Sequence, residues 1–141
     1  MDTSASPRAY IFELPMKVRD YEVDSEGIVN NAVYLHYLEH SRHEFCEWAG
    51  LSFREMHSAG IDPVLSKVTI RYRQPLGLGQ RFISKLALDR RGPLFIFYQD
   101  LYTESGAPVV TAEVEVACLE GGRLSRGLPL EEAFKKFLPE K

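Results

Sequence analysis

Apolar and polar residues alternate in five stretches of the chain, and a period of two predicts β-strands with one buried face. The stretches are residues 10–19, 67–73, about 81–89, 94–103 and a last one that ends at Gly121-Gly122. The inward face of the last strand is expected to carry Val110, Ala112, Val114, Val116 and Cys118. Turn sequences at Arg91–Pro93 and Ser105–Pro108 join the last three strands. We therefore expect an antiparallel meander.

A helical period replaces this alternation between the first two strands, over residues 31–49. The apolar side chains that recur there at helical spacing are Tyr34, Tyr37, Leu38, Phe45 and Trp48. Asn30 or Asn31 can cap the free N–H groups at the start of this helix, and Gly50 can take the left-handed conformation that ends it. Two shorter helices are expected at residues 52–60 and 129–137.

A twisted sheet can wrap around one long helix and bury it on most sides. The predicted fold class is therefore α+β, in the arrangement called the hotdog fold, with an antiparallel sheet of five to six strands wrapped around one long central helix. A single domain over residues 1–141 is expected, because 141 residues with 45% apolar content can hold one ordinary core. The sheet would leave an edge strand unpaired, and pairing with the same edge of a second copy predicts a homodimer or homotetramer.

Charge and composition exclude several classes of partner. The net charge is −3 and the basic residues are scattered, which excludes the phosphate-tracking stripe of nucleic-acid binders. Cys46 and Cys118 form no CxxC pair, so we expect reduced, buried thiols. No apolar run is long enough to span a membrane and no signal peptide pattern is present, so a cytoplasmic protein is expected.

A polar loop over residues 19–31 carries the candidate chemistry, because it brings carboxylates to the start of the long helix. A helix N-terminus can stabilise the oxyanion of a reacting carbonyl, with a nearby carboxylate as nucleophile or base. Asp24 and the Asn31 amide would be that pair. The same residue types are also ordinary capping and turn residues, and on the residues alone both interpretations stay open.

The segment from Tyr21 to Glu39, YEVDSEGIVNNAVYLHYLE, closely resembles the signature of the 4-hydroxybenzoyl-CoA thioesterase family. That signature has an Asp, two residues, Gly-Ile/Val-Val, a short polar or aromatic pair, and a helix with Tyr and Glu. The resemblance covers roughly residues 10–120. It implies a thioester hydrolase in which Asp24 is the nucleophile or the general base for water, and the Asn31 backbone N–H polarises the thioester carbonyl. Gly27 would allow close approach of the chain.

The resemblance also implies a binding site for an acyl-CoA or acyl-carrier-protein (acyl-ACP) substrate. Arg90 and Arg91, on the later hairpin, would meet the CoA phosphates, and Tyr34 would help to shape the acyl pocket. Many bacterial members have Tyr-His where this chain has Asn30-Asn31, whereas the Val-Asn-Asn-Ala form looks more like the branch with plastid acyl-ACP enzymes. Both carriers therefore stay open.

Two further points concern alternatives and assembly. A non-catalytic hotdog module that binds acyl thioesters as a sensor is the alternative function, and the presence of Asp24 favours the enzyme. The pocket is expected at a subunit seam, with the Asp24 loop from one subunit and the strand at residues 61–66 from the other. Asp62-Pro63 is expected to make that strand irregular.

His36, His40 and His43 recur along the long helix and, with Glu39, could gather a metal. A stripe of this kind is more often a polar helix face, so no metal and no other cofactor is predicted. Arg42 and Glu44 are expected as solvated charges or as ion pairs at the subunit seam.

Overall fold

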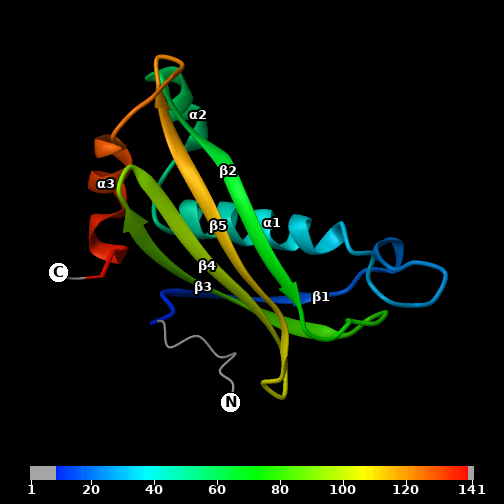
Figure 1. The fold of residues 1–141 in the computed structure, drawn as a ribbon. Helices are drawn as coiled ribbons and strands as arrows, with labels where there is room; N and C mark the ends of the chain where they lie inside the picture. Colours follow the sequence, from blue (N-terminus) through cyan, green and yellow to red (C-terminus); the bar gives the residue numbers. More distant parts are fainter. Residues whose placement is uncertain (1–8, 140–141) are drawn as a thin grey trace.

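The computed structural model describes residues 9–139, in which the longest helix, α1 (Val33–Trp48), crosses one face of an antiparallel sheet (Figure 1). The strands are β1 (Phe12–Lys17), β2 (Ile61–Tyr72), β3 (Arg81–Arg91), β4 (Leu94–Thr103), β5 (Pro108–Glu120) and β6 (Arg123–Leu124). The other helices are α2 (Phe53–Ser58), α3 (Leu128–Phe134) and the short 3-10 helices η1 (Asp20–Glu22) and η2 (Lys135–Phe137).

The strands lie in the order β1-β3-β4-β5-β2, and β6 pairs with β5. All pairings are antiparallel, so β3, β4 and β5 form the predicted meander, and β1 and β2 are its two edges. The predicted fold class, an antiparallel sheet of five to six strands curled over a long helix, is confirmed.

Strand β2 begins at Ile61, six residues before the alternation that predicted it. The expected irregularity at Asp62-Pro63 is wrong, because both residues pair in regular register with β5. The register shifts between Leu65 and Lys67 instead. Pro63 is tolerated because β2 is an edge strand, where a missing N–H need not break a ladder on both sides.

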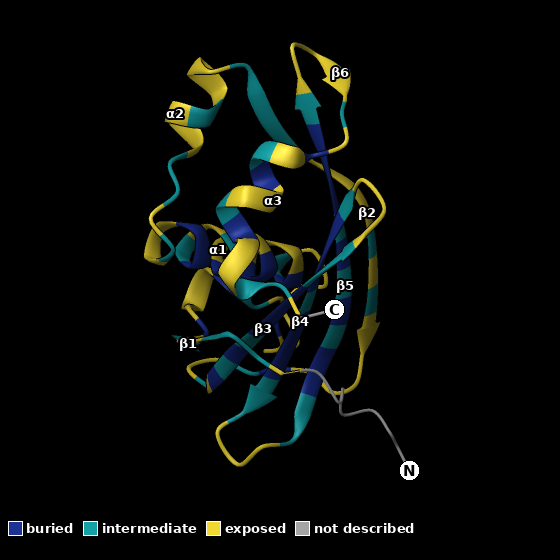
Figure 2. Cartoon of the chain, turned by 90° about the vertical axis from the view of Figure 1, so that its left-hand side faces the viewer, coloured by how far each residue is buried: buried dark blue, intermediate teal, exposed yellow. Residues whose placement is uncertain are grey.

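Helix α1 buries only one face, contrary to the expectation that the sheet covers most of it (Figure 2). The buried residues are Tyr34, Tyr37, Leu38, Ser41, Phe45 and Cys46. One sheet covers only one side of a helix. On β2, Leu65 and Tyr72 remain 56% and 47% exposed, although the Tyr72 ring lies 5.5 Å from that of Tyr34 on α1.

The C-terminal segment closes the core at the end of α1. The ring of Phe45 lies 6.0 Å from that of Phe134 and 5.2 Å from that of Phe137. Gly50 ends α1 with φ 85°, as predicted. Cys46 and Cys118 are free and buried, which also confirms the prediction. No helix within residues 9–139 is long and apolar enough to span a membrane.

Candidate active site

Asp24 lies at the tip of the loop that joins η1 to α1. Its N–H donates to the Ile28 carbonyl at 2.9 Å and its carbonyl accepts from the Gly27 N–H at 3.0 Å, so the chain reverses tightly here. Gly27 has φ 80°, and a Cβ atom there would meet nothing within 4 Å. Glycine is therefore required for its left-handed conformation. The segment at Gly77 approaches the Gly27 carbonyl, at 3.7 Å from a Cβ atom placed on Gly77, and a part of Gly27 in the reaction stays a prediction.

The Asp24 carboxylate is exposed and only partly engaged. Its Oδ1 accepts the Glu26 N–H at 2.8 Å, which orients the side chain, and within residues 9–139 its Oδ2 accepts no hydrogen bond. The group thus combines a fixed rotamer with one free oxygen. That combination suits either attack on a carbonyl carbon or removal of a proton from water.

The start of α1 leaves the predicted N–H donor free. The predicted capping by Asn30 or Asn31 is wrong, because the N-cap residue is Ala32, which has no side-chain capping bond. Asn30 stabilises the turn that precedes the helix: its Oδ1 accepts the Ala32 N–H at 2.9 Å and its backbone carbonyl accepts the Val33 N–H at 2.9 Å. In the described residues the Asn31 N–H has no acceptor, whereas the Asn31 carbonyl accepts from the Tyr72 hydroxyl at 3.3 Å. Asn31 therefore presents an unpaired donor at the positive end of a sixteen-residue helix.

Glu22 anchors the loop from below, and the sequence analysis did not identify it. Its side chain is 6% exposed and accepts from the Tyr37 hydroxyl at 2.8 Å and from the Arg19 N–H at 2.8 Å. A 3.0 Å ion pair with the Arg19 guanidinium completes its contacts, and its backbone carbonyl accepts the Asn30 N–H at 3.1 Å. Burial, with the hydrogen bond to Glu22, raises the pKa of Tyr37. No local pattern marks Glu22, because Tyr37 is fifteen residues away.

Tyr34 lies in the core beneath the same loop, with 2% of its surface exposed. Its hydroxyl accepts the Leu76 N–H at 3.1 Å, and the Leu76 carbonyl in turn accepts the Val29 N–H at 2.9 Å. Burial raises the pKa of Tyr34. Tyr34 thus supports the loop, and its contact with substrate stays a prediction.

Arg90 and Arg91 lie at the opposite end of the molecule from the Asp24 loop, where the β3-β4 hairpin approaches α3 (Figure 1). The Arg90 guanidinium pairs with Glu131 at 2.9 Å, donates to the carbonyls of Gly92 and Arg126, and covers the Phe95 ring at 4.8 Å. Arg91 is exposed and donates to the Tyr98 hydroxyl at 3.2 Å. One protomer therefore does not bring these arginines to Asp24, and their contact with CoA phosphates stays a prediction.

A groove runs between α1 and β2, along the helix face that the sheet leaves open. It consists of two cavities of about 330 Å³ and 150 Å³, which share Glu39, Arg42 and Leu65 in their walls. The larger cavity begins at Ala32, directly after Asn31, and the smaller one ends between Cys46 and the aromatic residues near α3. This α1-β2 groove therefore begins at the residue that follows Asn31 and continues beside an apolar wall.

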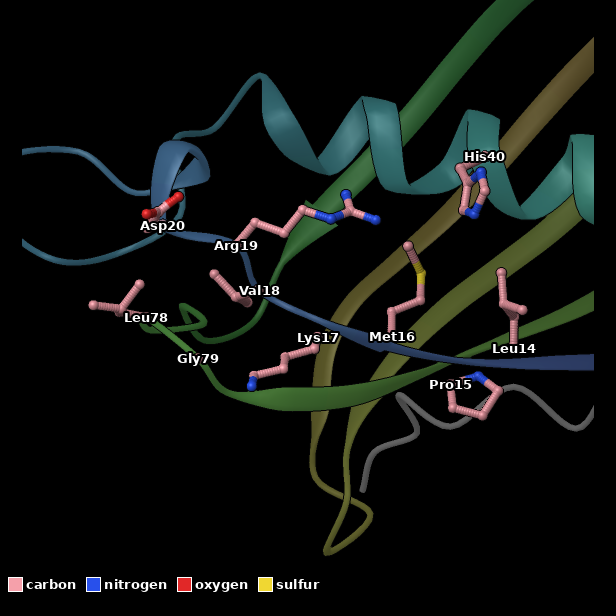
Figure 3. Close-up of a pocket in the computed structure, with 10 residues that line it drawn as sticks. All are labelled: Leu14, Pro15, Met16, Lys17, Val18, Arg19, Asp20, His40, Leu78 and Gly79. Carbon is pink, nitrogen blue, oxygen red and sulfur yellow. The ribbon is translucent and has the colours of Figure 1, made fainter.

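A larger and more open cavity of about 580 Å³ lies on the other side of α1, against β1 (Figure 3). Leu14 and Met16 point from β1 toward α1, and His40 points from α1 toward them (Figure 3). Arg19 also lines this cavity, but its guanidinium is already paired with Glu22. The three helix histidines are thus divided, since His36 lines the α1-β2 groove and His40 lines this cavity. Within residues 9–139 no three His, Cys, Asp or Glu side chains are grouped to hold a metal ion.

A curled antiparallel sheet, one long helix on its inner side and an acidic loop at the start of that helix define a hotdog-fold protein of the thioesterase class. The model of the family described as "Thioesterase-like superfamily" matches residues 18–138. The chain therefore belongs to the thioesterase-like superfamily.

Individual relatives agree with this assignment. The chain is 30% identical over 131 residues to the long-chain acyl-CoA thioesterase FadM of Escherichia coli, covering 89% of this chain and 95% of FadM. It is 38% identical over 86 residues to the acyl-acyl carrier protein thioesterase ATL3 of Arabidopsis thaliana, covering 61% of this chain and 45% of ATL3. The chain thus spans about half the length of that plant relative. The structure of Slr0204, a 1,4-dihydroxy-2-naphthoyl-CoA thioesterase from Synechocystis, superposes with a TM-score of 0.79 over 87% of this chain and 93% of that one; at 18% identity it is similar in fold.

Proposed function

We propose that the protein hydrolyses an acyl thioester to a free acid and a thiol. The observation that carries the proposal is the unpaired Asn31 N–H, which follows the Asp24 loop and directly precedes Ala32 in the wall of the α1-β2 groove. Family membership and the names of the relatives support the same reaction class. The carboxylate, the oxyanion donor and a channel for an acyl chain are the parts that this reaction needs.

Two routes fit the Asp24 carboxylate. As a nucleophile, its oxygen adds to the thioester carbon, the thiolate leaves and takes a proton, and water then cleaves the resulting mixed anhydride to restore the carboxylate. As a general base, it removes a proton from water while the water oxygen adds to the same carbon, and the proton passes to the leaving thiolate. In both routes the carbonyl oxygen gains negative charge, which the Asn31 N–H and the helix dipole stabilise.

The carrier is either CoA or the acyl-carrier protein. FadM is named for acyl-CoA and ATL3 for acyl-acyl carrier protein, so the relatives support both. The phosphopantetheine thioester is common to the two carriers, and the chemistry at Asp24 is the same for each.

A second copy of the chain is proposed to complete the pocket. Strand β2 is an edge of the sheet, is twelve residues long, and keeps Leu65 56% and Val64 36% exposed. An edge of this length with apolar side chains favours pairing with another strand. The partner's β2 would then cover the open side of the α1-β2 groove.

The test of the proposed reaction is Asp24→Asn, with thiol release measured on a panel of acyl-CoA and acyl-ACP substrates. We expect the variant to keep its fold, because Asp24 is exposed, and to lose turnover by about a hundred- to ten-thousand-fold. Glu26→Gln is the matched control, since it removes a carboxylate from the same loop but keeps the backbone N–H that orients Asp24. Unchanged turnover in folded Asp24→Asn would defeat the assignment. Tight binding without hydrolysis in the wild type would favour a sensor module.

A further inference from the structure

Arg42 lies halfway along the α1-β2 groove and lines both of its cavities. Its guanidinium donates to Gln99 Oε1 at 3.0 Å. Within the described residues it forms no ion pair, and an ion pair of Arg42 at a subunit seam stays a prediction. Burial lowers the pKa of Arg42, which shows that its charge is partly removed from water.

Gln99 holds this guanidinium in place. It is fully buried on β4, and its Nε2 donates to the Leu38 carbonyl at 2.8 Å while its Oε1 accepts from Arg42. The amide orientation is unambiguous, because a carbonyl can only accept and a guanidinium can only donate. Arg42 is therefore positioned by a bond to a rigid strand, and most of its five N–H donors remain available to the groove.

The surroundings of these donors are mostly apolar, since Leu38, Leu65, Val68 and Val114 share the larger cavity with Arg42. Glu39 also lines this cavity, but in the described part of the chain it forms no ion pair with Arg42. A plain hydrocarbon chain that passed this point would leave the charged donors without partners, which is costly once the proposed second copy covers the open side of the groove. An oxygen atom that accepts hydrogen bonds would satisfy them, and a carboxylate would do so in the two-pronged geometry that arginine favours.

The position of Arg42 sets where such an oxygen lies on the substrate. Arg42 follows Asn31 by eleven residues, so the two are about 16 Å apart along the helix axis at 1.5 Å per residue. The side chain leans back toward the helix start, which shortens this span. The oxygen therefore belongs to the far part of the acyl group and not to the carbons next to the thioester.

We propose that Arg42 binds an acceptor oxygen, of a hydroxyl or a carboxylate, on the distal part of the acyl group. The natural substrate is then an oxygenated acyl thioester rather than one with a methyl end. This inference rests on the proposed function and deepens it, because it uses the groove that begins at Asn31.

The experiment compares CoA thioesters of equal carbon number that end in a methyl group, a hydroxyl or a carboxylate, over a series of chain lengths. For the length that reaches Arg42, we expect wild-type kcat/KM to be about 10- to 100-fold higher for an oxygenated end. Arg42→Met should abolish this preference, mainly through KM. Arg42→Lys should restore it in part for the carboxylate and less for the hydroxyl. Arg54→Met, on exposed α2, is the matched control and should leave the preference unchanged.

The outcomes separate this inference from the reaction itself. Wild-type protein that hydrolyses methyl-ended chains as well as oxygenated ones at every length would overturn the role of Arg42 and leave the hydrolase intact. If folded Arg42→Met lost kcat/KM equally on all substrates, this would also overturn the role of Arg42 and leave the hydrolase intact. If no thioester is hydrolysed, the proposed function fails, and the shift in Tm caused by each compound then tests the arginine alone. If Arg42→Met does not fold, the comparison of methyl-ended with oxygenated substrates on the wild-type protein still tests the proposal.

Discussion

The hydroxyl of Tyr37 offers a sharp test of how the core holds the candidate active-site loop. It donates to Glu22 Oε1 at 2.8 Å, and both residues are buried, with 2% and 6% of their surfaces exposed. Tyr37→Phe removes this one oxygen and keeps the ring that packs 4.8 Å from Phe82. Because the lost bond has a charged acceptor, we expect the free energy of unfolding to fall by about 1.5–3 kcal/mol. The midpoint of thermal unfolding should fall by roughly 5–12 °C.

The size of this effect is bounded by what remains at Glu22. The Arg19 N–H and guanidinium still contact the carboxylate at 2.8 and 3.0 Å, so it is not left as an unpaired charge. The raised pKa of Tyr37 means that its hydroxyl stays protonated, and therefore a donor, at neutral and mildly alkaline pH. Because the Glu22 carbonyl accepts the Asn30 N–H, turnover should fall as well, even where the variant is fully folded.

Urea unfolding followed by circular dichroism measures the change in stability, and thiol release at a temperature well below the midpoint measures the change in turnover. Tyr21→Phe is the matched control, because Tyr21 is 75% exposed. We expect the free energy of unfolding of that control to change by less than about 0.5 kcal/mol. A Tyr37→Phe variant as stable and as active as the wild type would refute the view that the Glu22 contact holds the loop.

Two other predictions concern the groove and the assembly. Burial raises the pKa of Cys46 from its ordinary value of 9.0 to about 11, so in a Cys118→Ala background alkylation of the native protein should be slow at pH 8 and quicken toward pH 11. The contribution of the protonated Cys46 thiol to the free energy of unfolding is fully present below about pH 9 and is lost, by roughly 2–3 kcal/mol, as the pH rises toward 11. Cys46→Ala should not show this loss of stability at alkaline pH. Equal alkali sensitivity of the wild type and Cys46→Ala would contradict the prediction. Sedimentation should show a dimer or a tetramer whose activity falls on dilution as it dissociates, and a fully active monomer would contradict a shared pocket.

The sequence by itself determined most of the elements of this protein and the buried face of β5, whose Val110, Ala112, Val114, Val116 and Cys118 are all buried. Strand β4 occupies residues 94–103 as predicted, and the helix at Val33–Trp48 lies within the predicted 31–49. Gly50 ends that helix, and the Asn30 side chain accepts the Ala32 N–H just before the helix begins. These features follow from periods of two and 3.6 residues and from capping chemistry, which depend on neighbours a few positions away.

The local pattern also placed the Asp24 loop at the start of α1, because a motif of a dozen residues carries its own turn and cap. The local pattern could not show which contacts each residue makes in the folded protein. Gly27 is needed for its backbone angle, and Arg90 is bound to α3 at the far end of the molecule.

Only the tertiary structure decided the contacts that give the site its character. Glu22 becomes a buried anchor because Tyr37 folds over it, and Arg42 becomes a fixed cation in the α1-β2 groove because Gln99, 57 residues away, reaches it from β4. Such partners are set by the order of strands in the sheet and the path of α1 across it, and the free energy of burying a charge depends on those distant neighbours. The same folding leaves the inner side of β2 open, which alternation along the strand cannot reveal, because a period of two gives the face of a strand but not what covers it.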